Sequence, residues 1–163
     1  MAFRKKQPGK LVIEQTHDVA AVRAMLESAG MNSGGVEWPP ACYLAAYVGA
    51  EPVGIVGIEP MIDAALVRSL YVTESMRGRG IGAELLGAAR KAAHTRGARA
   101  LFLFSTGAGD YFKKFGFIEV PVAQLIAALE GVPQVEFYKA RPDELAREVA
   151  WYLNISHDGT RAY

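Results

Sequence analysis

The chain has 163 residues, of which 51% are hydrophobic and 21% charged, and its formal net charge is +1 at pH 7. Such a chain can bury one substantial core but is short for two independent domains, which usually need about 100–200 residues each. The near-neutral charge gives no excess positive field for a phosphate backbone, so nucleic acid is not an expected partner. We predict a single domain over residues 1–163, with a core at about 11–120 and an extension at 121–163 whose structure the sequence leaves open.

Cysteine, histidine and hydropathy patterns narrow the class of protein further. The single cysteine, Cys42, cannot form a disulfide within the chain, and the histidines His17, His94 and His157 share no metal-ligand spacing. The basic N-terminus is not followed by an apolar segment, and no run of about 18 apolar residues occurs. These features predict a cytoplasmic protein without a metal and without membrane association. A homodimer is left open.

The first half of the chain has the hydrophobic spacing and turn residues of one strand, one helix and three further strands. The predicted strands are 11–14, 41–48, 52–58 and 64–72, and the predicted helix is 19–29. Thr16 or Asp18 can cap the start of this helix, and Gly30 can end it. The Gly- and Pro-rich stretch 31–40 is expected to form a loop or a broken helix. Short turns favour antiparallel pairing of the last three strands.

The second half begins with a long amphipathic helix, predicted from Ile81 to a stop at Gly97. A strand at 101–104, a short helix at 110–115 and a strand at 117–120 follow. Because a strand, a helix and a strand form a right-handed crossover, strands 64–72 and 101–104 should be parallel. Weaker patterns in the extension predict helices at 121–130 and 142–147 and a closing strand at 148–155. The fold class is therefore α/β with a mixed sheet, in the order β-α-β-β-β-α-β-α-β.

A strand, a short loop and a glycine-rich helix start follow one another directly at residues 70–82. Glycines at a helix start let backbone N–H groups approach an anion, and the helix dipole favours negative charge there, which suits a pyrophosphate. Arg77 and Arg79 add positive charge. The alternative is a plain glycine turn with exposed arginines. Gly82 is not followed by Lys and Ser or Thr, and antiparallel strands precede the motif, so neither a phosphate loop nor a dinucleotide fingerprint fits.

With these residues the chain resembles the GNAT acetyltransferases, whose signature is Arg or Gln, two residues, Gly, one residue, then Gly or Ala. Arg77, Gly80 and Gly82 match it, and the resemblance extends over about 11–120, including the aromatic stretch 111–117. It implies a GNAT-like fold in which the parallel strands splay to form an acyl-CoA cleft. The implied co-substrate is acetyl-CoA or a close acyl-CoA, and the implied reaction moves the acetyl group to the primary amine of a small molecule by direct attack.

The resemblance also implies a set of cofactor-binding residues along the end of strand 64–72, the glycine loop and the facing segments. The backbone of Leu70 and Val72 would pair with the pantetheine arm, and the stretch 77–82 would wrap the pyrophosphate. The full set is Leu70, Tyr71, Val72, Arg77, Gly78, Arg79, Gly80, Ile81, Gly82, Ser105 and Phe112.

The expected catalytic groups are not at their usual positions. Leu66 and Arg68 stand where family members often carry a glutamate base, and Phe112 stands at the position of the tyrosine acid. Glu59 is a candidate base that would act through water, with a solvated hairpin residue as the alternative. Tyr111 is a candidate acid, but it lies one residue early and about 100° around the helix. The replacements keep a second function open, a catalytically degenerate acyl-CoA-binding or interaction module.

Arg68 is charged within an otherwise apolar strand, where strand alternation puts it on one face with Leu66 and Leu70. A buried arginine requires a partner. That partner can be a structural carboxylate such as Glu59, or the carboxylate of an amino-acid substrate held in a bidentate fork. The sequence around Arg68 and the glycine loop is similar to arsenic-resistance N-acetyltransferases and to N-acetylglutamate synthases, which favours an amino acid or an analogue as acceptor.

Overall fold

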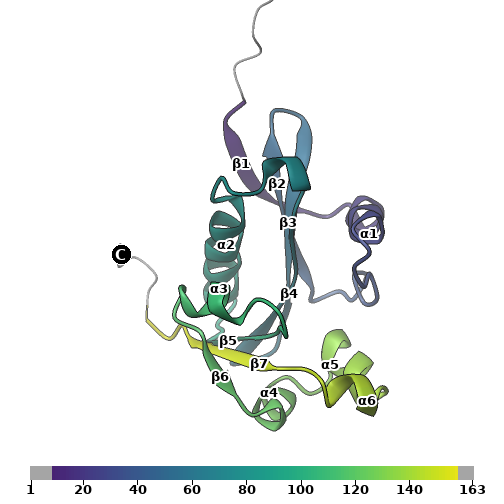
Figure 1. Ribbon diagram of the computed structural model, residues 1–163, viewed down its shortest axis with the longest axis vertical. Helices are drawn as coiled ribbons and strands as arrows, with labels where there is room; N and C mark the ends of the chain where they lie inside the picture. The colour runs from purple at the N-terminus through teal and green to yellow at the C-terminus, as the bar shows by residue number, and fades with distance from the viewer. Residues whose placement is uncertain (1–8, 158–163) are drawn as a thin grey trace, which may run out of the picture.

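The computed structural model describes residues 9–157 and contains a seven-stranded sheet in the order β1-β2-β3-β4-β5-β7-β6 (Figure 1). The strands are β1 Leu11–Thr16, β2 Cys42–Val48, β3 Glu51–Pro60, β4 Ala64–Val72, β5 Ala100–Phe104, β6 Ile118–Val120 and β7 Ala150–Asn154. The helices are α1 Val19–Ser28, η1 Glu74–Met76, α2 Ile81–Thr95, α3 Gly109–Lys113, α4 Val122–Ala128, α5 Pro133–Lys139 and α6 Pro142–Leu145. The predicted order of elements through β6 and the mixed α/β fold class are confirmed.

Helices cover both faces of the central strands. Helices α2 and α3 lie on one face, and α1 lies on the other together with α5 and α6 (Figure 1). Helix α2 has apolar side chains at helical spacing, and its buried stripe includes Ile81, Leu85 and Ala89. Helix α1 is capped by Asp18, whose carboxylate accepts a hydrogen bond from the Ala21 N–H at 3.0 Å. The middle of the sheet is therefore buried on both sides.

The parallel pair β4–β5 is short. Its register runs Ala64 to Ala100, Ala65 to Leu101 and Leu66 to Phe102, and then stops. Strand β7 pairs with β5 along its whole length, antiparallel, and separates β5 from β6. The predicted parallel arrangement of these strands is confirmed, and the strands diverge beyond Leu66 and Phe102.

The C-terminal extension adds α4, α5, α6 and β7, and its helices pack on the lower part of the sheet. Leu125, Leu129 and Val135 form a buried cluster with Leu66 of β4 and Phe102 of β5. Helix α5 was not predicted, because its seven residues carry too few apolar positions to define a helical period. No helix among residues 9–157 is long and apolar enough to cross a membrane.

Candidate active site

Strand β4 contains a β-bulge at the point where it leaves β5. Its register with β3 shifts between Gly57, opposite Arg68, and Ile55, opposite Tyr71, so β4 has one more residue than its partner here. Ser69 has φ of 59°, a left-handed conformation that is uncommon outside glycine. The bulge bends the strand away from β5 just after their last paired residues.

The bulge also changes which face of β4 each side chain occupies. Before it, Leu66 packs toward α4 and α5 while Val67 packs against α2; after it, Leu70 packs against α2 and Tyr71 on the α1 side. The prediction that Arg68 and Leu70 share a face is therefore wrong. Strict alternation with a period of two does not hold across a bulge, because one residue is inserted into the pleat.

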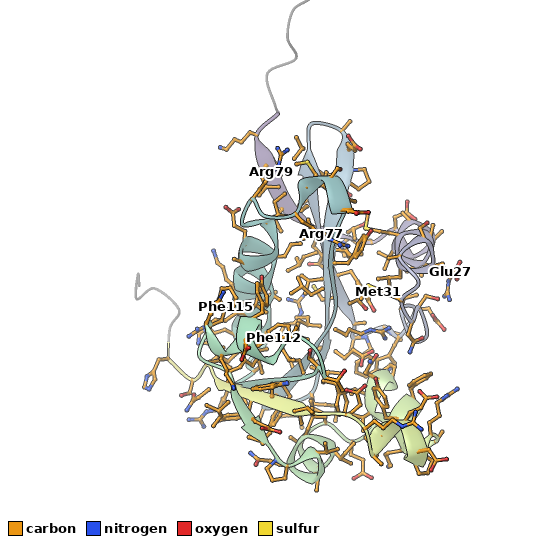
Figure 2. All side chains as sticks on the ribbon, in the orientation of Figure 1. Glu27, Met31, Arg77, Arg79, Phe112 and Phe115 are labelled. Carbon is orange, nitrogen blue, oxygen red and sulfur yellow. The ribbon has the colours of Figure 1, made fainter. Side chains whose placement is uncertain are left out.

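A cavity of about 370 Å³ lies in the gap between the diverging strands. Its lining comes from residues 67–70 of β4, residues 103–105, Ala108 and residues 111–112 on one side, and from Met31 after α1. Figure 2 places Phe112 on the α2 side of β4 and Met31 on the α1 side. The cavity thus reaches through the sheet, so two substrates can approach each other from opposite faces.

The glycine loop shapes the start of α2 next to this cavity. Gly78 and Gly80 have φ of 76° and 80°, and Gly80 is the N-cap of α2 without a side-chain cap. The first backbone N–H groups of a helix have no partner within it, and the helix dipole is positive at this end. The loop therefore presents open donors and a partial positive charge, as an anion site requires.

The two arginines of the loop differ in their contacts. The Arg77 Nε donates to the Val72 carbonyl at 3.0 Å, and its guanidinium lies 5.6 Å from the centre of the Tyr71 ring. Its side chain thus ties the loop back to the end of β4. Arg79 is exposed and, among residues 9–157, has no ion-pair or hydrogen-bond partner. Figure 2 shows Arg79 beyond the top of α2, where its charge remains available to a ligand.

Tyr111 reaches from α3 to the first turn of α2. A Cβ added at Gly82 would lie 2.9 Å from the Tyr111 hydroxyl oxygen, so glycine is the residue that leaves room for this contact. The Tyr111 ring packs edge-on against Phe112 and Phe115, with centroids 5.3 Å and 5.0 Å away. Burial raises the pKa of the Tyr111 hydroxyl above its usual value, so the group is a proton donor at neutral pH.

Arg68 and Glu59 form a buried ion pair beneath the cavity. The Arg68 Nη1 lies 3.0 Å from a Glu59 carboxylate oxygen, and their side chains are 2% and 0% exposed. The second Glu59 oxygen accepts from the backbone N–H of Gln134 in α5 at 2.9 Å. Burial raises the pKa of the Glu59 carboxyl, and the Arg68 charge opposes that rise. The structural carboxylate considered as a partner for Arg68 is therefore in contact with it.

Three further hydrogen bonds hold Arg68. Its Nη1 donates to the Gly34 carbonyl at 2.6 Å, its Nη2 to the Asn32 carbonyl at 2.8 Å, and its Nε to the Ser69 hydroxyl at 3.1 Å. Sequence reasoning did not identify Asn32, Gly34 or Gln134, since each takes part through its backbone. The network joins the loop after α1, the bulge of β4 and the start of α5.

The remaining predicted site residues lie around the same gap, with two facing away from it. Ser105 lines the cavity, its hydroxyl accepts from the Ala108 N–H at 3.2 Å, and its carbonyl accepts from the Trp151 indole at 2.9 Å. Tyr71 packs on the α1 side with its ring beside Arg77, and the Ile81 side chain is buried in the core, so Ile81 can meet a ligand only through its backbone. Within residues 9–157 no group of three or more His, Cys, Asp or Glu side chains is arranged to hold a metal ion.

Comparisons with known proteins agree with this geometry. Residues 39–119, about half of the chain, match the family model described as acetyltransferase (GNAT) domain. No curated protein sequence gives a significant match. The fold and this match place the chain in the GNAT acetyltransferase family. The predicted family is thus confirmed.

Solved structures with this fold include proteins crystallised with CoA. N-acetylglutamate synthase from Neisseria gonorrhoeae, complexed with coenzyme A and N-acetyl-glutamate, has a TM-score of 0.66 and 18% identity over 93% of this chain. The chain spans only 36% of that synthase. Rv2747 from Mycobacterium tuberculosis, in complex with CoA and NLQ, has a TM-score of 0.68 and 15% identity, covering 88% of this chain and 98% of the other. A GNAT-family acetyltransferase from Staphylococcus aureus Mu50 has a TM-score of 0.66 and 12% identity, covering 90% and 99%.

Proposed function

We propose that this chain transfers an acetyl group from acetyl-CoA to the primary amine of a small molecule, by direct attack of the amine on the thioester. The observation that carries the proposal is the uncapped start of α2 beside a cavity that passes through the sheet. The anionic end of one substrate fits the helix start, and its acyl end fits the cavity. The second substrate can then enter from the opposite face.

The residues at the site fit a CoA thioester. Gly78 and Gly80 have positive φ and place no side chain in the loop, and Arg79 supplies a positive charge that has no partner among residues 9–157. The backbone of 67–72 has no β5 pairing on its open edge, because the register stops at Leu66. In this proposal the backbone of Leu70 and Val72 binds the pantetheine arm. When bound, acetyl-CoA supplies the activated acyl group, and the chain supplies positioning.

Positioning and proton donation are the two demands of this reaction. The amine must be neutral and close to the carbonyl carbon, and the departing thiolate needs a proton. Tyr111 lines the cavity and is protonated at neutral pH, so it is our candidate acid. Glu59 is a weaker candidate base than the sequence indicated, because both of its oxygens are already in hydrogen bonds.

The contacts of Arg68 support a narrower class of acceptor in this proposal. Four of the five N–H groups of its guanidinium are donated to protein atoms, and one Nη2 N–H has no partner among residues 9–157. A bidentate fork to a substrate carboxylate would require breaking the existing network. An amino-acid analogue that needs a single hydrogen bond therefore fits better than a clamp on a free carboxylate.

Binding of acetyl-CoA is the first test, because the alternative function, an acyl-CoA-binding or interaction module without turnover, also predicts it. A ligand that binds only the folded state stabilises it by RT ln(1 + [L]/Kd), so acetyl-CoA at about 100 times Kd should add about 2.7 kcal/mol. Thermal denaturation with and without acetyl-CoA measures this. The absence of any shift at millimolar acetyl-CoA would contradict the proposal. Free thiol release with a panel of amines then separates the enzyme from the binding module.

Tyr111→Phe tests the proposed acid. Loss of the donor should lower kcat by about 10²–10⁴-fold while the Kd for acetyl-CoA changes little, because the ring and its aromatic packing remain. Tyr152→Phe is a matched control, since it removes the same hydroxyl from a tyrosine that does not line the cavity. Equal, small effects in both variants would mean that the thiolate takes its proton from another group.

A further inference from the structure

The cavity has an unusual chemical composition for a site that must use a neutral amine. Among the residues that line it within 9–157, none carries a carboxylate or an imidazole. Its polar groups are the Arg68 guanidinium and the hydroxyls of Ser69, Ser105 and Tyr111, and the remainder is apolar. Hydroxyls and a guanidinium do not accept a proton from an ammonium ion at neutral pH. The residues that line the cavity therefore include no group that can accept a proton from an amine.

The carboxylates on the surrounding segments are occupied elsewhere. Glu59 is fully buried and bound by Arg68 and the Gln134 N–H. Glu37, in the loop after α1, is paired with Arg23 at 2.8 Å. Glu148, before β7, accepts from the Tyr138 hydroxyl at 2.7 Å.

The other acids near the site point away from it. Asp110 of α3 is fully exposed and 3.8 Å from Lys113. Glu27 accepts from the Ser33 hydroxyl at 3.2 Å, and Figure 2 shows it on the outer side of α1. Tyr43, which packs beside Gly57 on the Arg68 side of the sheet, cannot act as a base either, because burial raises its pKa to about 12. None of these carboxylates, and not Tyr43, is among the residues that line the cavity.

The charge of the cavity wall also limits which acceptor can bind. The Arg68 charge is offset by Glu59 at 3.0 Å, so the network has no net charge to balance a substrate carboxylate. A desolvated carboxylate needs a compensating charge, whereas a neutral carbonyl needs only a hydrogen bond. The one remaining Arg68 N–H can supply that bond.

We propose that the acceptor is a weakly basic primary amine beside an uncharged carbonyl, as in an α-amino amide, and that its nitrogen reaches the site already neutral. This inference rests on the proposed function and narrows it. The amine nitrogen forms a bond to the acyl carbon, and the carbon–sulfur bond breaks. The nitrogen loses one proton to solvent, and the sulfur gains one from Tyr111, which solvent reprotonates. The products are the N-acetyl amide and free thiol.

Three acceptors with the same isobutyl group test the inference on the wild-type protein: leucinamide, leucine and 3-methylbutylamine. An α-amino group with a pKa of about 7.7–8.0 is about one-tenth neutral at pH 7, whereas an alkylamine near 10.4 is neutral in about one molecule in 2,500. We therefore expect kcat/KM at pH 7 to be about two orders of magnitude higher for leucinamide than for 3-methylbutylamine. Leucine should be at least about tenfold poorer than leucinamide, because its carboxylate lacks a counter-charge in the cavity and also makes its amine more basic.

The pH dependence of kcat/KM tests the inference more directly than the ratios at pH 7. For 3-methylbutylamine kcat/KM should rise about tenfold per unit from pH 7 to 9, while for leucinamide it should level off above about pH 8, each following the amine's own pKa. Profiles that bend at one common pH would reveal an enzyme base and overturn the inference, and so would a preference for leucine. If none of the three is acetylated although acetyl-CoA raises the melting temperature, the inference about the acceptor is contradicted, whereas the proposed binding of acetyl-CoA is not. If acetyl-CoA gives no melting shift, the proposed function itself has failed.

Discussion

Arg68→Leu should lower the free energy of unfolding by about 3–5 kcal/mol, because it leaves the Glu59 carboxylate buried without a counter-charge. The carbonyls of Asn32 and Gly34 lose a donor in the same variant. Denaturant unfolding monitored by circular dichroism measures the loss. Acetyl-CoA binding should change little when measured below the melting transition, since the glycine loop does not touch Arg68.

A second variant separates the ion pair from the rest of the network. Adding Glu59→Leu to Arg68→Leu should recover part of the lost stability, because paired buried charges can often be replaced together by apolar residues at little cost. The recovery should be incomplete, since the two carbonyls stay without their donor. Arg23→Leu is the matched control: its pair with Glu37 is exposed, so its loss should cost less than about 1 kcal/mol. A loss as small as that for Arg68→Leu would contradict a structural role for the pair.

The position of Arg68 also shows where sequence reasoning reached its limit. Its burial and its need for a partner followed from one charged residue in an apolar strand, and Glu59 was among the partners considered. The bulge at Ser69 could not be predicted from the sequence, because a single inserted residue leaves the surrounding hydrophobic pattern almost unchanged. The hydrogen bonds from Arg68 to the carbonyls of Asn32 and Gly34 could not be predicted either, since every residue carries the same backbone groups.

The order of elements up to β6 could be predicted because long, periodic segments such as α2 bury one clear stripe. The extension could be predicted only in part. Helix α5 is short, and it is held in place by tertiary contacts, including buried Val135 and the Gln134 N–H bound to Glu59. Such a helix depends on partners distant in the sequence, which local periodicity cannot reveal.

Gly82→Val should weaken acetyl-CoA binding by about ten- to a hundredfold while changing the free energy of unfolding by less than about 1 kcal/mol. The added side chain would stand beside the open N–H groups of the first turn of α2, and charged hydrogen bonds of this kind contribute about 1.5–3 kcal/mol. Gly82 is helical, so a side chain there is not strained by its backbone. The Cβ contact of 2.9 Å is with the hydroxyl at the end of Tyr111, which can move.

Two further glycines make the measurement interpretable. Gly80→Val should lose both binding and about 1–3 kcal/mol of stability, because φ of 80° is strained for a β-branched residue. Gly87, on an exposed part of α2, has nothing within 4 Å of an added Cβ, so Gly87→Val should leave the Kd unchanged. Isothermal titration with acetyl-CoA gives the three Kd values, and chemical unfolding gives the stabilities. If Gly82→Val bound acetyl-CoA as tightly as Gly87→Val, the start of α2 would be a structural turn and the pyrophosphate would have to bind elsewhere.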